Sequence, residues 1–150
     1  MTKMSPYEGF LHIKMKLFYP AKTNNLNKTG VGGLGEVVAA EYLREKGYRI
    51  VETNFRNRIG RQIGEIDIVA YKKDFLVFIE VKSRVWNENF EILPEENITP
   101  SKIRKLQKTI QLYIKLHKLW EKKWRLDAVT VIFDKDLKKT KIRHLPDIFI

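Results

Sequence analysis

The chain has 150 residues and a formal net charge of +11, from 29 Lys and Arg against 18 Asp and Glu. This length favours one domain, and the charge makes a polyanion, nucleic acid before membrane, the first expected partner. Disulfides, thiolate metal sites and Cys nucleophiles are excluded because there is no Cys. No apolar run is long enough to span a membrane. Lys14 and Lys16 interrupt the apolar N-terminal stretch, so we expect a cytoplasmic protein without a signal peptide.

Residues 1–27 differ in pattern from the rest and are interpreted as an N-terminal extension to a domain at 28–150. Residues 11–17 alternate between apolar and polar side chains, the period of two that a strand has. Residues 20–27 are polar and rich in turn formers, which indicates a linker. Two interpretations stay open for the extension, an extra edge strand or a loose segment.

The domain itself is predicted as α/β, in the order helix, three strands, helix, two strands. Phe75 to Val81 is a continuous apolar run, typical of a central strand buried on both faces. Thr99-Pro100 has the pattern of a helix N-cap followed by proline in the first turn. Residues 84–98 lack periodicity and are predicted as a long loop. The expected elements are a helix at 33–46, strands at 48–55, 64–71 and 75–81, a helix from 100 to about 119, and strands at 124–133 and 141–150.

Within the second predicted strand, alternation places Ile66, Ile68 and Ala70 on one side and Glu65, Asp67 and Val69 on the other.

A glycine-rich segment, Gly30 to Gly35, fits the G-x-G-x-x-G pattern of dinucleotide-binding proteins. That fingerprint needs a strand immediately before it, and the polar residues that precede Gly30 are poor strand formers. We therefore interpret the segment as a flexible glycine entry into the first helix.

The three histidines, His12, His117 and His144, have no partner at metal-ligand or catalytic spacing. His117 falls on the apolar stripe of the second predicted helix and is expected to pack there. Nothing supports a zinc site, although a triad assembled in space is not excluded by spacing alone.

Charged residues interrupt two apolar strands. Glu80 and Lys82 are two residues apart at the end of a buried run, so their side chains share a face. The simplest interpretation is an ion pair. Asp67 lies in the adjoining strand of the predicted hairpin, and a second carboxylate on the same patch indicates a site for a hard cation such as Mg²⁺. Glu36, in the first turn of the first helix, is available to complete it.

Nine basic residues lie between 102 and 125, with only Glu121 against them. A basic helix face is often merely solvated, but this excess favours a surface that binds phosphate backbones. A basic turn after the first strand offers a second contact. The predicted nucleic-acid contacts are Arg56, Arg58, Arg61, Arg84, Lys102, Lys105 and Lys108.

A set of short motifs gives the chain a resemblance to a known family over about residues 28–150. The motifs are Gly35-Glu36, Ala39-Ala40-x-Tyr42-Leu43, Gly47-Tyr48, Asn54-x-Arg56, Gly64-Glu65-Ile66-Asp67, Phe78-Ile79-Glu80-Val81-Lys82-Ser83-Arg84, Ile98-Thr99-x-x-Lys102 and Arg125-Leu126-Asp127. They resemble the YraN-like family of uncharacterised bacterial proteins. That family is similar to the PD-(D/E)XK nucleases, which include restriction endonucleases and archaeal Holliday-junction resolvases.

The resemblance implies a restriction endonuclease-like fold, a mixed sheet flanked by helices. It carries the superfamily's Asp to Asp67, its E-x-K pair to Glu80 and Lys82, and its helical Glu to Glu36. The residue after the lysine is Ser83 instead of the usual Thr. Asp67 and Glu80 would be the metal ligands, and Glu36 would bind a second metal or orient a water.

The resulting hypothesis is a Mg²⁺-dependent endonuclease, with Mn²⁺ as an alternative cofactor, that acts on DNA more than RNA in repair, recombination or DNA processing. Lys82 would steady the attacking hydroxide or the charge on the phosphate, while Glu65 has no assigned role. The alternative is a non-catalytic nucleic-acid-binding module or partner subunit with a vestigial site. A junction resolvase would need a homodimer, for which the sequence has no decisive signal.

Overall fold

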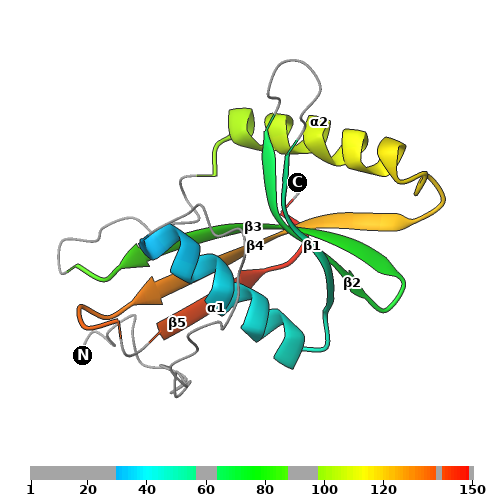
Figure 1. The fold of residues 1–150 in the computed structure, drawn as a ribbon. Helices are drawn as coiled ribbons and strands as arrows, with labels where there is room; N and C mark the ends of the chain where they lie inside the picture. The colour runs from blue at the N-terminus through cyan, green and yellow to red at the C-terminus, as the bar shows by residue number, and fades with distance from the viewer. Residues whose placement is uncertain (1–29, 57–63, 88–97, 138–139, 149–150) are drawn as a thin grey trace, which may run out of the picture.

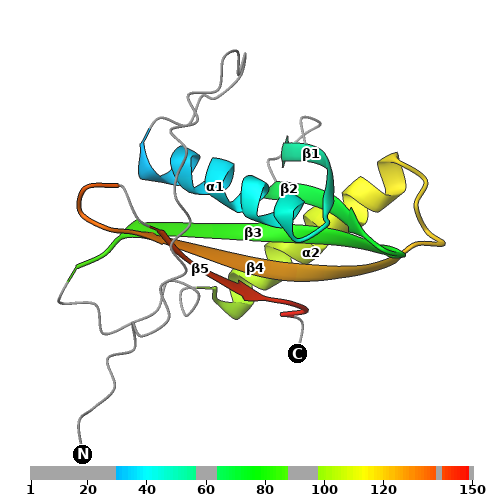
Figure 2. The ribbon, with the colours of Figure 1, turned by 90° about the horizontal axis from the view of Figure 1, so that it is seen from below.

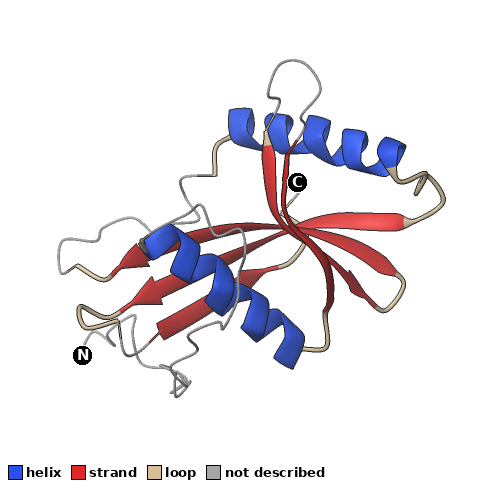
Figure 3. Ribbon diagram, viewed as in Figure 1, coloured by secondary structure: helices blue, strands red, loops and turns tan. Residues whose placement is uncertain are grey.

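A computed structural model of the chain describes residues 30–56, 64–87, 98–137 and 140–148. Two helices and five strands follow one another in the order predicted from the sequence (Figure 3). The extension expected at 1–27 lies outside the described residues. In the described ranges, no helix is both long enough and apolar enough to cross a membrane. The elements are α1 (Val31–Glu45), β1 (Arg49–Arg56), β2 (Glu65–Lys72), β3 (Phe75–Val85), α2 (Pro100–Leu116), β4 (Lys123–Phe133) and β5 (Thr140–Leu145).

The five strands form one mixed sheet in the order β1-β2-β3-β4-β5. The central pair, β3 and β4, is parallel, and every other neighbouring pair is antiparallel. Parallel neighbours need a crossover connection, and the segment that contains α2 supplies it (Figure 1). The predicted α/β class with a mixed sheet flanked by helices is therefore confirmed.

The two helices are separated by the sheet, and each covers its own apolar cluster (Figures 1 and 2). Leu43 of α1 is in one cluster with Ile79 of β3. Leu106 of α2 is in the other with Phe78 of β3. Successive residues of β3 thus alternate between two buried faces, which is why this strand is an uninterrupted apolar run in the sequence.

Two predicted boundaries around the crossover were wrong. α2 ends at Leu116, three residues before the predicted end, because Lys118 has a φ of 55°, in the left-handed region that ends a helix. β3 continues to Val85, into the segment predicted as a loop, because it stays paired with β4 as far as Phe133. Most of the remaining segment, residues 88–97, lies outside the described residues.

The last strand is also shorter than predicted and ends at Leu145 instead of Ile150. Pro146 has no N–H to donate, and Asp147 has a φ of 51°, so the chain leaves the ladder here. It remains attached to β4, because the backbone N–H of Ile148 donates to the Leu126 carbonyl at 2.8 Å.

The predicted alternation in β2 was wrong at one residue. Ile68 and Ala70 pack in the cluster beneath α1, as a shared face requires, but Ile66 packs in the cluster beneath α2. The pairing of β2 with β3 stops at Ile68↔Ile79. The start of β2 and the end of β1 turn toward α2, where Phe55 contacts the Tyr113 ring at a centroid distance of 4.9 Å (Figure 1).

Candidate functional site

β3 carries a buried carboxylate at the end of its apolar run. Glu80 is only 3% exposed, and its Oε1 lies 2.9 Å from Lys82 Nζ and 3.3 Å from Lys102 Nζ. The first of these contacts is the ion pair expected from the sequence. The second comes from the first turn of α2, where Thr99 Oγ1 caps the helix by accepting from the Lys102 N–H at 3.2 Å. Two ammonium groups thus offset the cost of burying this charge.

Asp67 lies at the point where β2 separates from β3. Beyond the last paired residues, its Oδ2 accepts a hydrogen bond of 2.8 Å from the backbone N–H of Val81. The Val81 N–H thus donates to a side-chain carboxylate, where in a continued ladder it would donate to a backbone carbonyl of β2. Asp67 is 8% exposed, and the contact places its carboxylate against the residue that follows Glu80.

Glu36 belongs to a second polar group, formed by α1, β1 and β2. The Asn54 side-chain amide, turned so that its NH₂ faces the carboxylates, donates to Glu36 Oε2 at 3.1 Å and to Glu65 Oε1 at 2.9 Å. Glu65 Oε2 also lies 3.0 Å from the Arg56 guanidinium. Arg56, predicted to contact nucleic acid, and Glu65, which had no assigned role, are thus partners. Asn54 has a φ of 54°, which Asn tolerates better than most residues.

Gly35 allows α1 to approach β3 closely. A Cβ at this position would overlap the Ser83 side chain, whose Oγ donates to the Val31 carbonyl at 3.0 Å. The glycine-rich segment was interpreted as a flexible entry into the helix. Instead α1 already begins at Val31, and Gly35 is buried inside it. The close approach fixes the position of the neighbouring Glu36.

The donor set fits a hard cation with few protein ligands. Asp67 and Glu80 offer carboxylate oxygens, and Mg²⁺ is commonly bound by one or two carboxylates and several waters. Among the residues that the structure describes, no three His, Cys, Asp or Glu side chains group closely enough to hold a metal. Glu36 as a third ligand therefore stays a prediction, and the two-carboxylate site is the one that the contacts support.

The structure divides the predicted basic cluster into separate parts. Lys102 contacts Glu80. Arg125 is bound to Asp127 inside the fold and is not available to phosphate. Arg58 and Arg61 lie outside the described residues. The exposed basic residues of α2 are Arg104, Lys105, Lys108 and Lys115, and Arg84 is exposed on β3.

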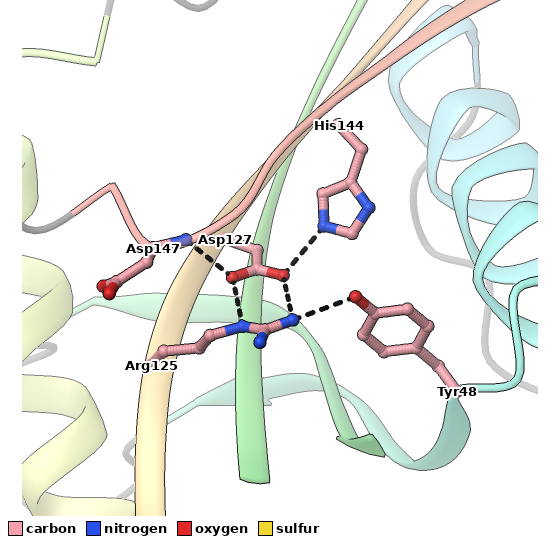
Figure 4. A network of polar contacts seen from close by, with 5 residues as sticks. All are labelled: Tyr48, Arg125, Asp127, His144 and Asp147. Carbon is pink, nitrogen blue, oxygen red and sulfur yellow. Dashed lines mark hydrogen bonds and ion pairs between the residues drawn. The ribbon is translucent and has the colours of Figure 1, made fainter. Parts of the chain in front are cut away.

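A polar network that the sequence analysis missed surrounds Asp127 (Figure 4). Arg125 donates from Nε to Asp127 Oδ1 at 2.9 Å and from a terminal nitrogen to Oδ2 at 3.2 Å and to the Tyr48 hydroxyl at 3.0 Å. His144 Nε2 lies 2.8 Å from Asp127 Oδ2, and the Asp147 N–H donates to Oδ1 at 3.0 Å. The partner of His144 lies 17 residues away in the chain, so sequence spacing gave no sign of it.

This network joins Tyr48, the residue before β1, to β4, β5 and the segment after β5, so its role is structural. Asp127 is fully buried. Burial alone would raise the pKa of its carboxyl, but hydrogen bonds from His144, the Asp147 N–H and Arg125 hold that pKa below its usual value. The sequence feature that could have indicated this network is the Arg125-Leu126-Asp127 motif, which places opposite charges two residues apart on one face of a strand.

His117 is only partly packed, although the sequence placed it on the apolar stripe of α2. It is the C-cap of that helix, its ring lies 4.2 Å from the ring of Tyr113, and its Nε2 is 3.9 Å from Glu52 Oε2. The rest of the ring is exposed because α2 has ended. Burial, together with Glu52, raises the pKa of Tyr113 to about 12.

The fold and the paired strand carboxylates define an α/β protein with a buried acidic site at the point where two strands separate. The chain belongs to the uncharacterised protein family UPF0102, whose family model matches residues 35–131. This confirms the YraN-like resemblance.

Relatives in that family match most of the chain. A UPF0102 protein of Caldanaerobacter subterraneus is 38% identical over 83% of this chain and 98% of its own length. Another, from Syntrophomonas wolfei, is 40% identical over 79% of this chain and 96% of its own length. A solved structure titled "Crystal structure of SSO0001" matches 77% of this chain and 50% of its own with 14% identity and a TM-score of 0.29, a likeness that carries no argument.

Proposed function

We propose that this protein binds nucleic acid, DNA more than RNA, and hydrolyses phosphodiester bonds as a Mg²⁺-dependent endonuclease, with Mn²⁺ as an alternative cofactor. The observation that carries the proposal is the buried Glu80, whose Oε1 contacts the ammonium groups of two lysines. Beside it, Asp67 accepts a hydrogen bond from the backbone N–H of the next residue, Val81. Structural ion pairs in a strand rarely take this form, because a buried charge costs more than an apolar residue of the same size. The similarity of the family to PD-(D/E)XK nucleases supports the same assignment.

In this proposal Asp67 and Glu80 hold the cation, which when bound lowers the pKa of a water and polarises a phosphoryl oxygen. Lys82 has a different task. Its ammonium is held beside Glu80 and remains partly exposed, so it is positioned to stabilise negative charge on the phosphate or on the attacking hydroxide. Exposed basic residues of α2 bind the flanking phosphates.

Branched or recombination intermediates of DNA are the substrates that the superfamily resemblance favours. Cutting two strands of a junction requires two active sites, so a resolvase activity implies a homodimer. A junction-specific cleavage pattern, together with a dimeric mass in light scattering, would support this form of the proposal.

A second candidate function is a non-catalytic nucleic-acid-binding module or partner subunit. The contacts of Glu80 favour it, since Lys82 and Lys102 already neutralise this carboxylate without a cation. A vestigial site would keep this arrangement for stability alone.

The deciding experiment is a cleavage panel with Mg²⁺ or Mn²⁺ on single-stranded, duplex, flap and four-way DNA. Wild type is compared with Asp67→Asn and with Asp74→Asn, an exposed residue in the turn of the same hairpin. We expect cleavage by wild type and by Asp74→Asn, and none by Asp67→Asn. If wild type binds DNA yet cuts nothing with either metal, the binding module replaces the nuclease. If it binds no nucleic acid at low salt, both proposals are wrong.

A further inference from the structure

An exposed tryptophan marks the turn that follows α2. Trp120 is 64% exposed and Leu116, at the end of α2, is 52% exposed. Tryptophan is highly buried on average, because removing its large apolar surface from water is favourable. Leaving it in solvent has a cost that a binding function would offset.

The surroundings of Trp120 are strongly basic. Glu121 is the single acidic residue in the segment 115–123. Lys122 Nζ also lies over the ring of Tyr71, at 5.9 Å from its centroid. The exposed lysines of this segment are Lys115, Lys118, Lys122 and Lys123.

Further basic residues lead from Trp120 back toward the candidate site. Arg104, Lys108 and Lys115, with the uncharged Gln111 between them, occupy positions i, i+4, i+11 and i+7 of α2, so the four share one face, here named the outer stripe. All four are exposed, α2 has no acidic residue, and its buried residues lie on the opposite face. From Arg104 to Lys115 the outer stripe is about 17 Å long. At an axial spacing of about 3.4 Å between the phosphates of one strand, this length matches roughly five phosphates.

We propose that Trp120 stacks on an unpaired base of single-stranded nucleic acid whose phosphates lie along the outer stripe. This inference rests on the proposed nucleic-acid binding and adds the form of the substrate. An indole face beside lysines suits this partner, because every base has a face to stack and every linkage a charge to bind. Paired bases stay stacked on one another inside a duplex, so a duplex gives Trp120 no partner.

A protein partner fits this surface less well. A stable protein interface buries about 800 Å² on each side, and the exposed apolar residues here are one Trp and one Leu. An anionic membrane would match the lysines and the Trp, but it would not need a basic row that continues for the length of α2. The surface therefore favours a strand with free bases.

The test is to measure affinity for oligothymidylate, for an abasic strand of equal length and for duplex DNA, in low salt. We compare wild type, Trp120→Leu and the control Leu116→Ala, an exposed neighbour that cannot stack. Trp120→Leu should bind oligothymidylate about 5- to 100-fold more weakly, with duplex and abasic affinities unchanged. Leu116→Ala should match wild type. Oligothymidylate should quench the tryptophan fluorescence of wild type, and the quenching should disappear in Trp120→Leu.

The outcomes separate this inference from the proposed function. If wild type binds neither DNA form, nucleic-acid binding itself has failed. If wild type binds and Trp120→Leu binds oligothymidylate equally well, only the stacking role of Trp120 is overturned. Anionic phosphatidylserine vesicles serve as the last arm. A blue shift of the tryptophan emission with vesicles that is absent in Trp120→Leu, without quenching by oligothymidylate, would overturn the inference in favour of a membrane surface.

Discussion

Lys102 Nζ, at the start of α2, lies 3.3 Å from Glu80 Oε1 in β3. The contact thus joins two consecutive elements, the strand before the crossover and the helix within it. Lys102 thus contacts a carboxylate of the candidate site, although the sequence placed this lysine among the phosphate contacts. This contact ties the N-terminus of α2 to the sheet, at the place where a cation would need the same carboxylate.

Lys102→Met should strengthen the binding of Mn²⁺. The substitution removes one of two ammonium groups that compete with a cation for Glu80, while Lys82 remains to offset its buried charge. Calorimetric titration of Mn²⁺ measures the effect. Lys105→Met, an exposed change on the same helix, should leave the affinity at the wild-type value. Weaker or unchanged binding in Lys102→Met would show that the two do not compete.

Asp67→Asn and Asp67→Ala should differ in stability though both lack cleavage. Asn keeps an oxygen that can accept from the Val81 N–H, so its free energy of unfolding should stay within about 1 kcal/mol of wild type. Ala leaves that donor without a partner and should cost about 1–3 kcal/mol. Urea unfolding measures both. Equal stability of the two variants would contradict the contact between Asp67 and Val81.

Gly35→Ala should destabilise the protein by about 1–3 kcal/mol, because the added methyl overlaps Ser83 and forces α1 away from β3. Gly32→Ala is the matched control, since a Cβ there meets nothing within 4 Å and alanine favours helix. It should be neutral or stabilising by up to about 1 kcal/mol.

Adding Ser83→Gly to Gly35→Ala removes the overlapping atoms and should recover part of the loss. Urea midpoints of the three variants test the close approach. A Gly35→Ala protein as stable as wild type would refute it.

Helices and strands were predicted well where a few neighbouring residues in the sequence determine them. The Thr99 cap, the Pro100 start and the apolar run of β3 each lie within a few residues of sequence, and all three are present in the structure. The predicted ends of α2 and β5 were wrong because Lys118 and Asp147 adopt positive φ angles. Lys and Asp do not by themselves predict such angles.

The site was predictable to the extent that spacing determines it. Glu80 and Lys82 share a face because they are two apart in one strand. The contact from Lys102 depends on where the crossover places α2, and the partner of His144 lies on another strand. Neither contact follows from a regular spacing in the sequence, so only the folded structure reveals them.

Replacing Lys105 and Lys108 with Ala should weaken DNA binding about equally for all sequences, because phosphate contacts position the protein without reading bases. Both residues are exposed on α2. Each lost contact should reduce the slope of log affinity against log salt by about 0.9 on duplex DNA. A control with Lys46 and Arg143 changed to Ala removes the same charge from other exposed positions. An equal loss in that control would show that net charge, not α2, drives binding.

Acid should destabilise the protein through Asp127. Its pKa in the folded chain is below the usual value, because hydrogen bonds from His144, the Asp147 N–H and Arg125 outweigh the effect of burial. A lowered carboxyl pKa gives stability that is complete above the unfolded pKa of about 3.9 and is lost as the pH falls through the folded pKa.

Asp127→Asn should therefore be less stable at pH 7, by about 3 kcal/mol for a broken buried pair. As the pH falls from about 4 to about 2, it should lose less further stability than wild type does. Urea unfolding across that range measures the slope. Asp136→Asn, an exposed carboxyl, should keep the wild-type slope. An unchanged slope in Asp127→Asn would mean that the acid sensitivity comes from carboxylates outside the network of Tyr48, Arg125 and His144.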